Sequence, residues 1–199
     1  MKKNKFDLSD IAERILIEGT PAIERTIHRE EYYLKAYPAL LSLGDSAADD
    51  QSLWAVELAV YGWLPTILQV RPSAVFSTTT VEDARNAHSL GEAVSVLEEL
   101  NPNGPTDHSW IAVSKVLHAI NPRVYPILDR RVASAFDYAP WSLRKRQALI
   151  DFTVAMHNPP DKIIPVIADA KERGKHAFGY EMTDIRALEL ILFALDRQE

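Results

Sequence analysis

Asp129 is the residue of this sequence whose surroundings are best suited to chemistry. The apolar stretch 110–120 predicts a helix that ends before Asn121-Pro122, because proline disfavours helical geometry in the residue before it. A second helix is predicted to begin near Asp129, since apolar residues recur after it at helical spacing. Asp129 would then be an N-cap or first-turn residue, where the helix dipole favours the ionised carboxylate. Such a carboxylate can stabilise positive charge on a substrate.

Two arginines, Arg130 and Arg131, follow Asp129 in the predicted first turn, where the helix dipole disfavours cations. A phosphate ligand would explain them, because helix N-termini and arginine side chains both bind phosphate. An ordinary N-cap followed by two solvated arginines explains them equally simply. The residues alone leave both interpretations open.

Lys115 and His118 lie three residues apart on one face of the predicted helix 110–120, which is otherwise mostly apolar. Burial would lower the pKa of Lys115, as an amine nucleophile requires. Alternatively, Lys115 extends to the surface and His118 is a buried structural group. Tyr61 and Trp63 precede Pro65 near a predicted helix end, where they would either stack on an extruded base or pack in the core.

Apolar residues recur at helical spacing along most of the chain, in segments that end at proline or glycine, which predicts a series of helices. Strand-like alternation is nearly absent, so the predicted fold class is all-α. Arg186 and Glu189 lie three residues apart and are expected to form a helix-face ion pair on the last helix, worth well under about 1 kcal/mol. We expect one compact unit, with possible lobes 1–100 and 101–199 and a cleft between them. The predicted helices are 7–18, 21–35, 53–68, 80–100, 110–120, one beginning near 129, 141–157, 161–173 and 183–196.

The composition excludes several classes of site. The 199 residues contain no cysteine, which rules out disulfides, thiol catalysis and a cysteine-bound iron–sulfur cluster. The six histidines lack paired metal spacing and the seven glycines form no nucleotide-binding motif, so we expect no cofactor and no metal. The sequence has no long apolar run and no signal peptide, which predicts a soluble cytoplasmic monomer without a membrane partner.

The net charge of −6 disfavours a generic nucleic-acid binder, but the charges are unevenly distributed. Residues 101–150 carry seven basic and three acidic residues, and they include the candidate site. A few phosphate contacts would give a salt-sensitive affinity, whereas a solvated helix face is the alternative. The candidate DNA-backbone contacts are Arg123, Arg130, Arg131, Arg144, Lys145 and Arg146.

The segment Tyr125-Pro126-Ile127-Leu128-Asp129-Arg130-Arg131-Val132 resembles the part of helix-hairpin-helix (HhH-GPD) DNA glycosylases that carries their catalytic aspartate. Val113-Ser114-Lys115 resembles the motif of the oxidised-guanine glycosylases whose lysine attacks the sugar. The resemblance covers about 28 of the 199 residues, within 109–136. It implies that Asp129 and Lys115 are catalytic and that the relative is of the cluster-free kind. For such an enzyme, the candidate substrate contacts in this sequence are Tyr61, Trp63, Trp110 and His118.

The resemblance also implies a two-lobed glycosylase architecture. This sequence has Ser109-Trp110-Ile111-Ala112-Val113 where the family has small turn residues, so the hairpin is divergent, rebuilt around Asn103-Gly104-Pro105, or absent. The implied function is excision of a modified base from double-stranded DNA, with AP-lyase activity if Lys115 is the nucleophile. Implied substrates are an oxidised or alkylated purine in repair, or a hypermodified phage cytosine in anti-phage defence. The alternative is a non-catalytic helical protein-interaction module in which Asp129 only caps a helix.

Overall fold

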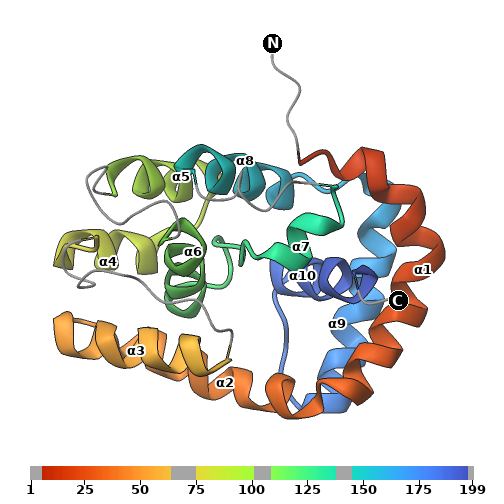
Figure 1. The fold of residues 1–199 in the computed structure, drawn as a ribbon, viewed down its shortest axis with the longest axis horizontal. Helices are drawn as coiled ribbons and strands as arrows, with labels where there is room; N and C mark the ends of the chain where they lie inside the picture. The colour runs from red at the N-terminus through yellow and green to blue at the C-terminus, as the bar shows by residue number, and fades with distance from the viewer. Residues whose placement is uncertain (1–5, 64–74, 101–108, 138–144, 197–199) are drawn as a thin grey trace.

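The computed structural model describes residues 6–63, 75–100, 109–137 and 145–196. Every regular element in these ranges is a helix, which confirms the predicted all-α class (Figure 1). None of the described helices has the length and apolar character that a membrane span requires. The elements are α1 (Leu8–Arg29), α2 (Glu31–Ser46), α3 (Asp50–Trp63), α4 (Thr78–Asn86), α5 (Leu90–Glu99), α6 (Ser109–Ile120), α7 (Arg130–Ser134), α8 (Arg146–His157), the 3-10 helix η3 (Asp161–Ile163), α9 (Ile164–Phe178) and α10 (Asp184–Leu195).

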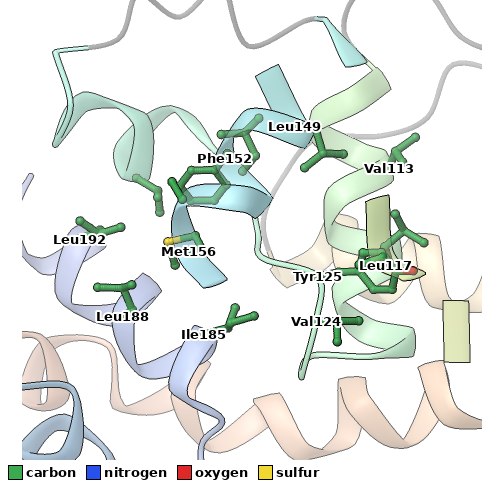
Figure 2. Close-up of a cluster of buried hydrophobic side chains, with 14 of the residues drawn as sticks. Val113, Leu117, Val124, Tyr125, Leu149, Phe152, Met156, Ile185, Leu188 and Leu192 are labelled. Carbon is green, nitrogen blue, oxygen red and sulfur yellow. The ribbon is translucent and has the colours of Figure 1, made fainter. Parts of the chain in front are cut away.

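One hydrophobic core joins both halves of the chain. Helix α10 packs on α1 and α9, α6 packs on α2 and α3, and α5 packs on α8. Figure 2 shows buried side chains of α6, α8 and α10, among them Leu117, Phe152 and Leu188, gathered in this core. In Figure 1, α1, α9 and α10 lie together on one side and α3 to α6 on the other. Helix α1, from the first hundred residues, therefore packs against two helices of the second hundred.

Helix α1 continues through Pro21, where the sequence predicted a stop. Pro21 is exposed, whereas Ala22, Ile23 and Thr26 after it are buried. The tertiary packing of α1 on α9 and α10 therefore outweighs the local cost of proline within a helix, and the break falls at Glu30.

Two glycines of the C-terminal half have different roles. Gly174 lies inside α9, although the predicted helix ended at residue 173. Glycine is needed there because a Cβ would lie 1.9 Å from Met182 Cε. Gly179 ends α9 with a φ of 75°, the left-handed conformation that glycine adopts without strain.

The predicted helix 80–100 is two helices, because a reciprocal capping box between Ser89 and Glu92 begins α5. The predicted helix 53–68 corresponds to α3, which begins at Asp50. One face of α3 is exposed to solvent, where Leu58 is 58% exposed. The predicted turn 103–105 and the segment around Pro65 lie outside the described residues.

Gly44→Ala tests the close approach of α2 to α6. An added Cβ would lie 1.9 Å from the carbonyl oxygen of Ala119, so the two helices would have to separate. We expect the free energy of unfolding to fall by about 1–3 kcal/mol in urea denaturation. Gly62→Ala is the matched control, because nothing lies within 4 Å of its Cβ and alanine favours a helix. Equal losses in both variants would contradict the packing argument.

Candidate active site

Lys115 lies on a buried face of α6, and only 4% of it is exposed. Burial lowers the pKa of the Lys115 ammonium to about 8, while the charge of Asp129 acts in the opposite direction. At neutral pH this lysine therefore has a larger neutral fraction than an ordinary surface lysine. A neutral amine is the form that a nucleophile requires.

Asp129 is the N-cap of α7, as predicted. Its backbone is extended, and its Oδ1 atom accepts a hydrogen bond of 2.8 Å from the backbone N–H of Val132. The side chain is partly exposed, and this capping bond uses only one of its two carboxylate oxygens. One oxygen of Asp129 therefore closes the helix while the other can face a ligand.

Lys115 and Asp129 both line one cavity of about 570 Å³. Its volume lies in the range of small-molecule sites. The walls combine two aromatic rings with charged groups of both signs and come from α1, α2, α6, α10 and the 127–132 segment. The lining residues are Thr26, Glu30, Tyr33, Leu34, Ile111, Lys115, Ile127, Asp129, Arg130, Arg131, Val132, Arg186, Glu189, Leu190, Phe193 and Asp196.

The two arginines after Asp129 both line this cavity but have different surroundings. The Arg131 guanidinium carbon lies 5.0 Å from the ring centroid of Phe193, a cation–π contact that attaches α7 to α10. This contact gives Arg131 a structural reason to occupy the first turn. Arg130 is exposed at the cavity, where its guanidinium can meet an anionic group of a ligand.

The other predicted phosphate contacts do not join the cavity walls. Arg146 donates hydrogen bonds of 2.9 Å to the carbonyl oxygens of Glu98 and Leu100, so it closes the C-terminal end of α5. These bonds argue against the predicted phosphate contact for Arg146. Arg123 and Lys145 are exposed elsewhere on the surface, and Arg144 lies outside the described residues.

The residues predicted to contact a base are not among the cavity walls either. Trp110 is buried beneath Arg146, whose guanidinium carbon lies 5.2 Å from the ring centroid. Tyr61 is 46% exposed on α3, and the side chain of Trp63 lies outside the described part of the chain. The aromatic walls of the cavity are instead Tyr33 and Phe193.

His118 belongs to a buried hydrogen-bond network instead of the cavity surface. Its Nδ1 atom lies 2.7 Å from the carbonyl oxygen of Tyr125, and its Nε2 atom lies 2.7 Å from the hydroxyl of Tyr37. Burial lowers the pKa of His118 to about 3, so the ring is neutral at physiological pH. A neutral ring donates from Nδ1 to the carbonyl and accepts the Tyr37 proton at Nε2.

Arg186 and Glu189 are the charged residues of the site that the sequence reasoning missed. The predicted ion pair between them is present, but it is buried and not on a solvated helix face, since the two side chains are only 10% and 1% exposed. Arg186 Nη1 lies 3.0 Å from Glu189 Oε2, and both residues line the cavity. The sequence did carry a signal for this burial, since α10 is apolar around most of its circumference.

Comparison of the chain with family models, curated proteins and solved structures finds no match. Among the described residues, no group of three or more histidine, aspartate or glutamate side chains is arranged to hold a metal ion.

Tyr37→Phe tests the buried network. The substitution removes the O–H that Nε2 of His118 accepts and leaves a buried acceptor without its partner, while the ring that Arg186 contacts at 4.8 Å is kept. We expect the free energy of unfolding to fall by about 1–3 kcal/mol in urea denaturation. Tyr32→Phe is the matched control, because Tyr32 is 83% exposed and should lose almost nothing. A wild-type stability for Tyr37→Phe would contradict the network.

Proposed function

We propose that this protein is a DNA N-glycosylase that holds an extruded modified base in the cavity and cleaves its N-glycosidic bond. The observation that carries the proposal is that Lys115 and Asp129 line the same cavity, with the pKa of Lys115 lowered to about 8. These are the two residues that the sequence resemblance assigns to catalysis. A buried amine next to a carboxylate suits attack on a sugar carbon that develops positive charge.

In the proposed reaction, the neutral amine of Lys115 attacks C1′ of the extruded nucleoside. The base leaves with the electron pair of the glycosidic bond and takes up a proton, and the amine loses one. The Asp129 carboxylate stabilises the charge at C1′. Opening of the sugar ring gives an imine, β-elimination cleaves the strand on the 3′ side, and water then releases Lys115. A hydrolytic route, in which Asp129 orients a water molecule, would leave an intact abasic site.

The cavity walls support recognition of a base with additional polar groups. Tyr33 and Phe193 provide aromatic surface for a base ring. The carboxylates of Glu30 and Asp196 can accept hydrogen bonds from a base, and the guanidinium of Arg130 can donate them. The volume of about 570 Å³ leaves room for a base that carries a substituent. Both substrate classes, an oxidised purine and a hypermodified phage cytosine, belong to this proposal, and so do a repair role and a role in phage defence.

Contacts with the DNA backbone are expected to be few. Arg130 lies at the cavity, and Arg123 and Lys145 are exposed elsewhere on the surface. With a net charge of −6 for the chain, binding would depend on these local cations and weaken as salt is added.

Borohydride trapping on damaged oligonucleotides and modified phage DNA tests the lysine route. We expect a covalent protein–DNA adduct whose yield rises with pH and passes through its midpoint near pH 8, because only the neutral amine of Lys115 attacks. Lys115→Gln should abolish the adduct. Lys162→Gln is the matched control, since Lys162 forms an exposed ion pair with Glu13 and should trap like the wild type. Abasic sites without trapping would support the hydrolytic route instead.

Asp129→Asn tests the role of the carboxylate. Asparagine is also a good N-cap, so the melting temperature should change little, while the excision rate should fall by about 10²–10³-fold. Asp7→Asn is the matched control, because Asp7 caps α1 with its side chain and is not among the cavity walls, so its activity should be unchanged. Full activity of Asp129→Asn, or no excision of any base by the wild type, would reject the glycosylase and favour the interaction module.

A further inference from the structure

Glu189 lies at the point where α10 meets the segment that leads to Asp129. Its Oε1 atom accepts a hydrogen bond from the backbone N–H of Ile127, two residues before Asp129, and its Oε2 atom accepts one from Arg186. The residue is 1% exposed, yet it lines the cavity with Lys115 and Asp129. One buried carboxylate therefore contacts both the ligand space and the backbone that carries the candidate catalytic acid.

The segment 124–128 depends on such side chains, since it belongs to no helix and pairs with no strand in the described structure. The Nδ1–H of His118 binds the carbonyl oxygen of Tyr125, and the hydroxyl of Ser114 accepts the N–H of Leu128 at 3.1 Å. Ile127 lies between Tyr125 and Leu128 in the segment, and its N–H is bound by Glu189, which belongs to α10 and not to α6. Removal of that bond would release the segment from α10 while its bonds to α6 remain.

The charged and titratable groups around Glu189 come from every side of this junction. Burial, with a smaller contribution from the charge of Asp129, raises the pKa of Glu189 to about 7 against the opposing effects of the Arg186 guanidinium and the Ile127 N–H. The neutral ring of His118 lies 3.4 Å away at Nδ1. The groups are Arg186 on α10, His118 and Lys115 on α6, Tyr37 on α2, and Asp129 before α7.

We infer that Glu189 is a positioning residue that holds Asp129 against the cavity while its carboxylate is ionised and releases that hold when it is protonated. This inference rests on the proposed excision reaction. In the ionised form the two oxygens accept from Ile127 and Arg186 together. Protonation weakens both bonds and leaves the buried Arg186 without its counter-charge. Glutamine keeps an acceptor oxygen but never carries the charge, so Glu189→Gln imitates the protonated form at every pH.

The test compares single-turnover excision rates of the wild type and Glu189→Gln from pH 5.5 to 9. At pH 8 we expect the variant to be slower by on the order of tenfold or more, because small displacements of a catalytic group have large effects. The ratio of the two rates should approach one near pH 5.5, where wild-type Glu189 is itself protonated. Taking this ratio removes the titration of Lys115, which both proteins share. Glu189→Asp, which keeps the charge, should retain the wild-type acid limb.

A ratio that stays constant with pH would reduce Glu189 to a purely structural group and overturn the inference.

A second measurement covers the case in which Glu189→Gln does not fold. In carboxyl-carbon NMR, Glu189 should titrate near 7 in the wild type and at a lower pH in Asp129→Asn, since the Asp129 charge raises the pKa of Glu189. An unchanged titration would overturn the inference. If this shift is found but the wild type excises no base, the proposed function alone has failed.

Discussion

The buried charge pair of Arg186 and Glu189 is the interaction on which the candidate site depends. Two charges that are removed from water need other polar or aromatic partners. Glu189 accepts a hydrogen bond from the backbone N–H of Ile127, and the Arg186 guanidinium lies 4.8 Å from the centre of the Tyr37 ring. Meeting these needs brings α2, α6, α10 and the 124–129 segment to one place. The cavity lies where they meet, and its shape follows from a requirement of electrostatics as much as from apolar packing.

Local signals in the sequence predicted part of this arrangement correctly. The end of α6 before Pro122, the N-cap at Asp129 and the extent of α10 depend on residues within one or two turns, and all three are confirmed. Proline and glycine misled at Pro21 and Gly174, because packing decided those positions. Helix α1 packs on α9 and α10 across Pro21, and Met182 occupies the space beside Gly174. A local stop signal is weak wherever the flanking residues are deeply buried.

The composition of the cavity could not be predicted in the same way. The bond between Glu189 and Ile127 joins residues 62 positions apart, and no local pattern encodes that pairing. His118 and Trp110 were assigned to a ligand because of their chemistry, although nearly all neighbours along α6 are apolar and therefore buried. Conversely, Tyr33 and Phe193 carried no motif and became walls only through the contact of α2 and α10 with the rest of the fold.

The position of α10 along the chain has a consequence for biosynthesis. Ribosomes release residues in order, so a nascent chain that has extended to residue 137 already contains Lys115 and Asp129 but lacks the wall formed by residues 186–196. Until α10 emerges, the Ile127 N–H has no carboxylate to bind and the lysine has less cover from water. An incomplete polypeptide would thus hold Lys115 and Asp129 without the assembled cavity, and any ligand binding that depends on the cavity would begin only after α10 has been translated.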